Sequence, residues 1–232
     1  MPRRVLITGT SSGLGQQLAE HYLANGDVVI GCARRAATID HPKYVHHLVD
    51  VRDEQTIATM LAAIRADQDG LDVLINNAGV AAMNAFALTP PATMHHIVDT
   101  NLLGPMVVTH GAIRLLRKSE AGRIVNITTV AVPLRLAGET VYAASKAALE
   151  SFTRGLAKEV GVFGITCNAV GPSLTPTRLT NGLPAAVRER LLSQQAIARQ
   201  GSAADVANVI DFFLRPESDL VTGQIVYLGG IS

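Results

Sequence analysis

The 232-residue chain is poor in several residue types that whole classes of protein need. It has no tryptophan, two cysteines and only 17% charged residues, and its 20 Lys and Arg nearly balance 19 Asp and Glu. This balance removes the basic surface expected of a nucleic-acid binder or of a protein drawn to an anionic membrane. With 48% hydrophobic residues the chain is neither disordered nor a disulfide-stapled fold. We therefore expect no nucleic-acid or membrane partner, and a function confined to a local site.

No hydrophobic run is long enough to cross a membrane. Residues 73–98 and 160–177 contain no Asp, Glu, Lys or Arg, but Gly, Pro, Asn and Thr interrupt both stretches, whereas a transmembrane helix needs roughly 18 or more consecutive apolar residues. Uncharged segments of this kind are typical of strands buried on both faces of a parallel sheet. The chain enters a strand-like run directly after Arg4, without a signal-peptide pattern, which predicts a cytoplasmic protein.

Strand-length apolar runs alternate with helix-period segments along almost the whole chain. Ile57, Met60, Leu61 and Ile64, for example, mark one helical face by their spacing. This alternation predicts a single domain over residues 1–232, an α/β Rossmann-like doubly wound parallel sheet of about seven strands flanked by helices on both faces. The expected strands are 5–8, 28–32, 44–49, 73–76, 124–128, 165–169 and 225–228.

Residues 173–200 depart from this alternation. Pro176, Gly182 and Pro184 precede a helical stretch at 185–195. Because this excursion follows a strand end, it is a candidate substrate lid over the carboxyl edge of the sheet. An ordinary surface loop and helix is the alternative.

The first strand ends in a glycine-rich turn that opens a helix. Glycines at such a turn let the backbone approach a pyrophosphate, whose charge the free N–H groups and dipole of the helix N-terminus favour. The turn comprises Gly9, Ser11, Ser12, Gly13, Leu14 and Gly15. Its spacing is neither the G-x-G-x-x-G fingerprint nor a P-loop.

Gly9, Ser11 and Gly13 also satisfy the G-x-S-x-G pattern of serine hydrolases. All seven histidines precede residue 111, however, which leaves none in the later half where a hydrolase usually supplies its base. Cys32 and Cys167 lie in predicted buried strands without a second Cys or His at ligand spacing, so we expect two core thiols and no metal site.

Further motifs make a specific resemblance. Asn76-Asn77-Ala78-Gly79 follows one strand, Asn101 lies in a helical segment, Thr129 follows another strand, and Tyr142 precedes Lys146 by four residues. With the glycine turn, this ordered set resembles the short-chain dehydrogenase/reductase family over essentially the whole chain, and within it the 3-oxoacyl-carrier-protein reductases. The resemblance implies an oxidoreductase that interconverts a carbonyl and a secondary alcohol by hydride transfer, with Asn101, Thr129, Tyr142 and Lys146 as catalytic residues.

The spacing of Tyr142 and Lys146 has a chemical reason. Residues four apart share one face of a helix, and a nearby ammonium stabilises a phenolate. We therefore expect Lys146 to lower the pKa of Tyr142 and make it a general acid/base. The resemblance adds that Lys146 hydrogen-bonds the nicotinamide ribose and that Asn101 holds a water linking the lysine to solvent.

Thr129 stands where the family usually has the serine that polarises the substrate carbonyl. Threonine keeps the hydroxyl, but its β-branch restricts its rotamers. Thr128 is the rival for this role. The alternative is a degenerate, inactive site, which predicts that Thr129→Ala leaves any reduction rate unchanged.

The cofactor expected is NADP(H). Ala33 stands where the family's NAD-type members place an Asp, and Arg34 and Arg35 follow. An arginine can pair with the 2′-phosphate of NADP, although Arg35 also fits a solvated surface residue. Ser173 replaces the family's usual glycine after Pro172, which makes the path of that loop less predictable. The expected cofactor-binding residues are Gly9, Ser11, Ser12, Gly13, Leu14, Gly15, Arg34, Arg35, Asp50, Val51, Asn77, Ala78, Gly79, Tyr142, Lys146, Pro172, Thr175 and Thr177.

The substrate is left open between a 3-oxoacyl thioester and a small ketone or other biosynthetic intermediate. The resemblance implies an acidic acyl carrier protein as a possible partner, for which Arg114, Arg117 and Lys118 would form a basic patch beside the site. A solvated helix end explains the same residues. Phe163 argues against docking, because many such reductases have a basic residue there.

A non-catalytic NADP-binding sensor or scaffold is the alternative of another class. Tyr142 and Lys146 argue against it, because binding alone needs no proton donor. The resemblance also implies a homotetramer or homodimer, formed by the helix that contains Tyr142 and the helix before it. Small residues there would permit close approach of two helices or packing on the sheet, namely Ala143, Ala144, Ala147 and Ala148.

Overall fold

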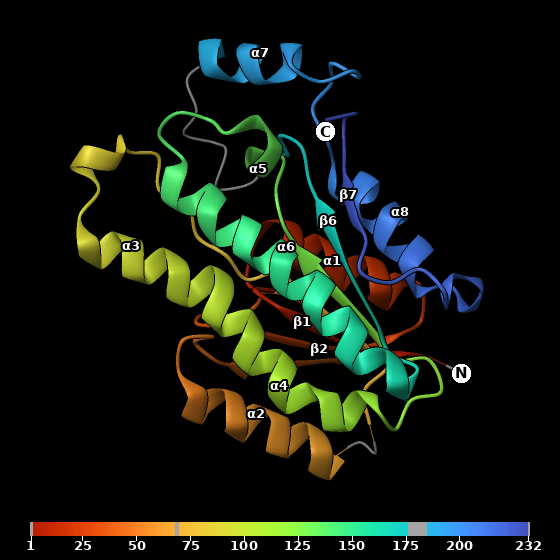
Figure 1. Cartoon of the computed structure of the whole chain (residues 1–232). Helices are drawn as coiled ribbons and strands as arrows, with labels where there is room; N and C mark the ends of the chain where they lie inside the picture. Colours follow the sequence, from red (N-terminus) through yellow and green to blue (C-terminus); the bar gives the residue numbers. More distant parts are fainter. Residues whose placement is uncertain (1, 68–69, 176–184, 232) are drawn as a thin grey trace.

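A parallel seven-stranded sheet forms the centre of the computed structural model, which describes residues 2–67, 70–175 and 185–231 (Figure 1). The strand order is β3-β2-β1-β4-β5-β6-β7. The predicted doubly wound fold is confirmed, and every strand lies within two residues of its expected bounds. The strands are β1 (Arg4–Thr8), β2 (Val28–Ala33), β3 (Tyr44–Leu48), β4 (Val73–Asn76), β5 (Arg123–Ile127), β6 (Thr166–Gly171) and β7 (Ile225–Tyr227).

Helices cover both faces of this sheet (Figure 1). One face packs against α2 (Glu54–Asp67), α4 (Gly104–Leu116) and α6 (Thr140–Val160). The other packs against α1 (Gly13–Ala24) and α8 (Ala203–Leu214). The order reverses between β1 and β4, which is where open α/β sheets bind ligands at the carboxyl ends of their strands.

Strand side chains alternate between the two cores. Leu6 and Leu74 pack beneath α2 and α4, whereas Ile7 and Ile75 pack beneath α1 and α8. All four side chains are fully buried. Period-two alternation with both faces covered leaves no outward position for a charge, which explains the uncharged stretch that begins at residue 73.

The helical periodicity read from the sequence is confirmed for α2. Ile57, Met60, Leu61 and Ile64 are all buried, and Asp53 caps the helix by accepting a 2.9 Å hydrogen bond from the Gln55 backbone N–H. Cys32 and Cys167 lie in the same core, where burial raises the pKa of each thiol to about 12 and leaves it unreactive.

Two shorter helices lie beyond the carboxyl ends of the strands. These are α5 (Ala131–Leu134) and α7 (Ala185–Ser193), which Figure 1 shows at the same end of the molecule. On the way to α4 the chain passes through η1 (Phe86–Leu88), α3 (Pro91–Val98) and a π-helical turn, η2 (Asp99–Leu103). The remaining short helices are η3 (Gly161–Phe163) and η4 (Pro216–Ser218). No helix in the described part of the chain has the length and apolar character needed to span a bilayer.

Candidate active site

The ends of β1 and β4 are hydrogen-bonded to each other at the point where the strand order reverses. The Thr8 hydroxyl accepts hydrogen bonds from the backbone N–H groups of Asn77 (3.0 Å) and Ala78 (2.9 Å). The Asn77 side-chain amide in turn donates to the Thr8 carbonyl at 2.8 Å. Side chains therefore hold the two loops that leave these strands in one fixed arrangement.

The glycine turn packs closely against these hydrogen-bonded loops because Gly9 and Gly15 have no side chains. Gly9 has φ +81°, and a Cβ atom there would lie 2.9 Å from the Asn77 amide nitrogen. A Cβ atom at Gly15 would lie 2.3 Å from the Gly9 carbonyl oxygen, inside van der Waals contact with backbone. The close approach leaves the N-terminus of α1 and its free N–H groups open toward the cleft, as an anion site requires.

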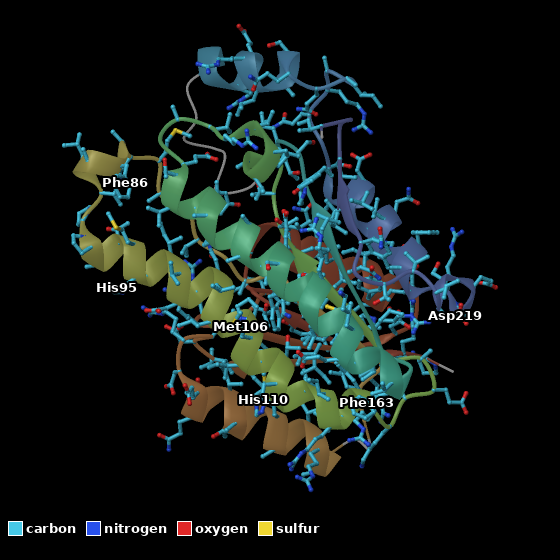
Figure 2. The ribbon with its side chains drawn as sticks, viewed as in Figure 1. Phe86, His95, Met106, His110, Phe163 and Asp219 are labelled. Carbon is cyan, nitrogen blue, oxygen red and sulfur yellow. The ribbon has the colours of Figure 1, made fainter. Side chains whose placement is uncertain are left out.

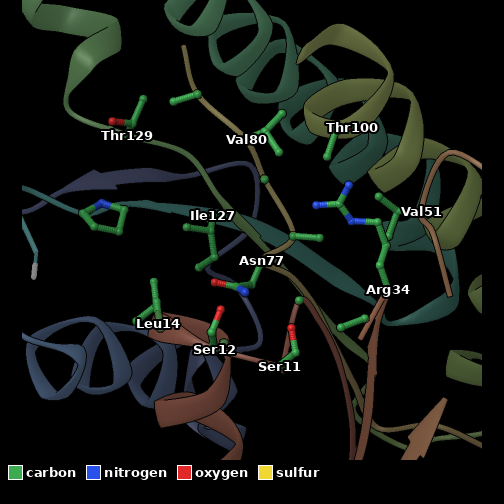
Figure 3. Close-up of a pocket in the computed structure, with 18 of the residues that line it drawn as sticks. Ser11, Ser12, Leu14, Arg34, Val51, Asn77, Val80, Thr100, Ile127 and Thr129 are labelled. Atoms are coloured by element: carbon green, nitrogen blue, oxygen red, sulfur yellow. The ribbon is translucent and has the colours of Figure 1, made fainter. Parts of the chain in front are cut away.

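A cleft of about 540 Å³ begins at this turn and follows the carboxyl ends of the strands. Figure 3 shows Ser11, Ser12 and Leu14 along one side of it and Thr129 at a distance from them. Thr177 lies outside the described residues. The structure brings together at this cleft all the other expected cofactor-binding residues and three of the four expected catalytic residues, Thr129, Tyr142 and Lys146.

Two charged residues from neighbouring strands lie at the cofactor end. Arg34 follows β2 and is exposed, and Figure 3 shows its guanidinium turned into the cleft beside Val51. Arg52 hydrogen-bonds the Asp50 carboxylate through Nε at 3.0 and 3.2 Å and lowers the pKa of that group, with a smaller contribution from Arg34. Asp50 is thus already paired with Arg52, which leaves the Arg34 guanidinium as a cation that faces this end of the cleft.

Tyr142 and Thr129 meet where the cleft turns away from the glycine loop. Burial raises the pKa of Tyr142 to about 12, although the neighbouring Thr129 hydroxyl opposes this rise. The expectation that Lys146 lowers the pKa of Tyr142 is therefore wrong, because desolvation of the phenolate outweighs the other influences. At neutral pH Tyr142 is a protonated phenol and can act as a proton donor.

Lys146 is buried one helical turn farther along α6. Its Nζ donates a 2.7 Å hydrogen bond to the Ile127 carbonyl at the end of β5. Burial lowers the pKa of Lys146 to about 8, while the negative charge of Glu150 opposes the shift. The ammonium is thus held at the floor of the cleft and close to its point of deprotonation.

Asn101 is fully buried and does not line the cleft. Its amide oxygen accepts from the Val80 N–H at 2.8 Å, and its amide nitrogen donates to the Val80 carbonyl (2.8 Å) and the Ser145 hydroxyl (3.1 Å). Asn101 lies in the π-helical turn η2, a geometry frequent at functional sites. It joins the segment after β4 to α6, and its water-holding role stays a prediction.

The structure separates the two adjacent threonines. Thr128 is buried and donates to Glu150 Oε1 at 2.6 Å, whereas Thr129 lines the cleft with Tyr142. Glu150 Oε2 accepts a 2.7 Å hydrogen bond from the Tyr227 hydroxyl of β7. Sequence reasoning missed Glu150, although its position four residues after Lys146 was a signal that the two share a helix face.

Thr100 is a second residue that the sequence did not reveal. It lines the cleft near Val51 and is buried (Figure 3). Its hydroxyl has no hydrogen-bond partner within the described ranges. Its neighbour Asn101 drew attention in the sequence, but nothing marked Thr100 itself.

The basic residues Arg114, Arg117 and Lys118 lie at the other edge of the sheet. Leu115 accepts a 3.2 Å hydrogen bond from the backbone N–H of Leu71, just ahead of β4, so α4 ends where the strands begin. The Arg117 guanidinium stacks 4.0 Å above the centre of the Phe163 ring, which Figure 2 places near the ends of α4 and α6. Within one chain this patch is not beside the cleft, contrary to expectation, because a crossover helix returns to the amino ends of parallel strands.

Comparisons with known proteins agree with this architecture. The family model described as Enoyl-(Acyl carrier protein) reductase matches residues 9–231. The 3-oxoacyl-(acyl-carrier-protein) reductase FabG of Pseudomonas aeruginosa is 36% identical over 97% of this chain and 95% of its own length. The Escherichia coli FabG is 32% identical with the same coverage.

A solved structure adds the three-dimensional match. The aldohexose dehydrogenase of Thermoplasma acidophilum superposes with a TM-score of 0.90 at 25% identity, covering 99% of this chain and 93% of that one. The similarity thus extends over the whole sheet and not only over the glycine turn. Sequence, sheet order and these likenesses together make the chain an oxidoreductase enzyme of the short-chain dehydrogenase/reductase family.

Proposed function

We propose that the protein reduces a carbonyl to a secondary alcohol, reversibly, with NADPH as the hydride donor. One observation carries the proposal: Tyr142, a protonated phenol, and Thr129 lie beside each other in the wall of the cleft that begins at the glycine turn. Two hydroxyl groups at one point can both donate to a single substrate oxygen, which a carbonyl supplies and an isolated carbon–carbon double bond lacks.

Each proposed catalytic residue has its own part in this reaction. Thr129 polarises the carbonyl oxygen, and Tyr142 donates its proton to that oxygen as negative charge develops. Lys146 stabilises the resulting phenolate by its charge and contacts the nicotinamide ribose, while Asn101 supports the proton path and fixes the segment that carries Val80. A bound nicotinamide cofactor would supply the hydride, and the glycine turn, the N-terminus of α1 and the loops after β3, β4 and β6 would hold it.

NADPH is the proposed form of the cofactor. Arg34 faces the cleft from the end of β2, where Ala33 leaves no carboxylate for the ribose hydroxyls of NADH. Asp50 is paired with Arg52 and so leaves Arg34 available for a phosphate.

The names of the relatives suggest a 3-oxoacyl thioester as substrate, with a small ketone as the alternative. Of the expected lid, residues 176–184 lie outside the described residues. We further propose that its described parts, residues 173–175 and 185–200 with α7, cover the substrate end, and that the chain acts as one domain that forms a homodimer or homotetramer through α4 and α6. Ala144 and Ala147 support this assembly, because they are exposed on α6 and do not pack on the sheet.

A carbonyl panel tests the proposal, with oxidation of NADPH and NADH followed at equal concentrations. The panel contains small ketones, a 3-oxoacyl thioester and an enoyl thioester. Tyr142→Phe removes one oxygen, so we expect a 10²- to 10⁴-fold loss of kcat with an unchanged Kd for NADPH. Comparable activity of wild type and Tyr142→Phe, or reduction of the enoyl thioester alone, would contradict it.

A further inference from the structure

A chain of hydrogen bonds joins the glycine turn to the arginine loop, residues 34–43, which connects β2 to β3. The Tyr44 hydroxyl at the start of β3 lies 2.9 Å from Thr10 Oγ1 and 2.8 Å from His46 Nδ1. The other ring nitrogen, His46 Nε2, lies 3.0 Å from the backbone carbonyl oxygen of Arg35. Two side chains of β3 therefore link the turn at the cofactor end of the cleft to the loop that carries both arginines.

A glycine in β2 makes room for this chain of hydrogen bonds. Gly31 is paired with His46 in the parallel ladder between β2 and β3. A Cβ atom at Gly31 would overlap the hydroxyl oxygens of Tyr44 and Thr10. A glycine inside a strand weakens the strand and often marks the close approach of another group. The contact between Tyr44 and Thr10 therefore depends on the absence of a side chain at Gly31.

The contacts of the His46 ring determine which of its nitrogens carries the proton. A backbone carbonyl can only accept a hydrogen bond, so Nε2 must donate to Arg35. In a neutral imidazole Nδ1 is then an acceptor, and the Tyr44 hydroxyl is a donor within its reach. The two neighbours thus favour the same tautomer, and they hold the Nε2–H group of His46 against the backbone of the arginine loop.

The arginine loop has few other contacts that fix its backbone. Within residues 2–67, 70–175 and 185–231, no hydrogen bond between backbone groups joins residues 34–40 to another segment. The Gln16 side-chain amide donates to the Thr38 hydroxyl at 3.4 Å, and Ile39 packs against the core beneath α1. Both contacts lie past the arginines. His46 is therefore the contact that acts on the backbone at Arg35 itself.

Both arginine side chains depend on this backbone for their position. Arg34 and Arg35 are exposed and line the cofactor end of the cleft, and Figure 3 shows the Arg34 guanidinium turned into it. A long cationic side chain loses rotamer freedom when it binds a phosphate, and a backbone held in advance lowers the entropy that must still be lost. Anchoring of the loop at Arg35 should therefore strengthen the binding of an anion by both arginines.

We propose that His46 is a positioning residue for the 2′-phosphate of NADPH, because its hydrogen bond to the Arg35 carbonyl holds the loop from which Arg34 and Arg35 reach that phosphate. The inference rests on the proposed use of NADPH. NADH has a ribose hydroxyl in place of the phosphate and gains little from either arginine. His46 therefore acts on the preference between the two cofactors, whereas a residue that only stabilises the edge of the sheet would affect both cofactors equally.

Fluorescence titrations of the complete chain with NADPH and with NADH test the inference without turnover. His46→Val should raise the Kd for NADPH by about 3- to 10-fold, the effect of one hydrogen bond, and leave the Kd for NADH within about twofold. His46→Gln keeps an N–H donor that can reach the Arg35 carbonyl and should restore the preference. Tyr44→Phe keeps the packed ring and should weaken the preference less. His95→Val removes the same ring from the exposed surface of α3 (Figure 2) and should change neither Kd.

Two nucleotides that differ only in the 2′-phosphate isolate its contribution. Isothermal titration with adenosine 2′,5′-bisphosphate and adenosine 5′-monophosphate should show the loss in His46→Val for the bisphosphate alone. Nitrogen-15 NMR of the histidine rings in the wild type gives a spectroscopic signature. The His46 signals, assigned by their absence from His46→Gln, should report a protonated Nε2 and an unprotonated Nδ1.

The outcomes separate this inference from the choice of cofactor. A ratio of NADPH to NADH affinity that survives in His46→Val, an equal loss for both cofactors, or a protonated Nδ1 with a bare Nε2 would overturn the role of His46 and leave NADPH as the cofactor. Equal affinity of the wild type for NADPH and NADH would overturn both. If His46→Val does not fold, Tyr44→Phe and the NMR signature decide the same question.

Discussion

The two ends of the cleft are formed by different kinds of structural element. The cofactor end consists of strand ends and glycines held by hydrogen bonds between side chains and backbone, as at Thr8 and Asn77. The substrate end consists of side chains from α5, the start of α6, α7 and the C-terminal segment, among them the polar residues Glu139 and Gln195. A rigid end recognises a fixed ligand, whereas an end made from separate segments can change its substrate through single side chains.

The largest expected effect of a single change is at the cofactor end. Gly15→Ala places a Cβ atom 2.3 Å from the Gly9 carbonyl, which is backbone and cannot rotate away. We expect a loss of about 1–3 kcal/mol in the free energy of unfolding and a loss of NADPH binding of about 100-fold or more. Denaturant unfolding and NADPH fluorescence titration measure the two effects.

Gly155→Ala on α6 is the matched control, because nothing beyond its chain neighbours and its own helix backbone lies within 4 Å of a Cβ there. It should stabilise the protein by about 0.5–1 kcal/mol. Equal behaviour of the two alanine variants would show that the cofactor end is not rigid, and would remove the contrast between the two ends.

Arg34→Asp should reverse the cofactor preference without affecting the substrate end. A hydrogen bond to a charged group contributes roughly 1.5–3 kcal/mol, so the ratio of NADPH to NADH affinity should fall by about 10- to 100-fold. Titrations of each cofactor give this ratio. The KM for the carbonyl substrate should stay within about twofold, and an unchanged ratio of affinities would disprove the NADPH assignment.

Thr129 lies between the two ends and tests whether threonine replaces the family's usual serine. Thr129→Val keeps the shape and removes the hydroxyl, so kcat should fall by about 10- to 100-fold. Thr129→Ser keeps the donor and should stay within about threefold. Steady-state measurement of kcat at saturating NADPH compares the two variants with the wild type. Full activity of Thr129→Val would remove Thr129 from the site.

The smallest effect is expected at Glu150, as a change in pH dependence. Its charge raises the pKa of Lys146, which burial holds near 8. Glu150→Gln removes that support, so the pKa of Lys146 should fall and the alkaline decline of kcat/KM should begin about one pH unit lower. At acidic pH the kcat/KM values of the wild type and Glu150→Gln should converge.

A pH profile of kcat/KM checks this shift at Glu150. Glu159→Gln on the exposed side of α6 removes the same charge and should leave the profile unchanged. Identical profiles of the two variants would contradict the assignment.

Much of the fold and of the cofactor end was predictable from the sequence, because both depend on local patterns. Ile57 to Ile64 mark a helix face, and the turn from Gly9 to Gly15 needs glycine at fixed positions for steric reasons. The pKa of Tyr142 was not predictable in this way. Spacing places Lys146 near it, but the degree of burial decides the direction of the shift.

The basic patch and the substrate end illustrate the same limit. Arg114 and Arg117 read as neighbours of the site, yet α4 carries them to the opposite edge of the sheet. Gln195 and Glu139 are more than fifty positions apart, and no periodicity links them. Only the packing of α5, α6 and α7 brings them to one wall.

By itself, then, the sequence determined the order of the elements, the glycine turn and the pairing of Tyr142 with Lys146 on one helix, since each follows from spacing along one strand or helix. The tertiary structure decided which hydroxyl faces the cleft, which charges are buried beside Lys146 and which polar atoms are left unpaired at the substrate end. These depend on burial, and burial is a property of how distant segments pack and not of the segments themselves.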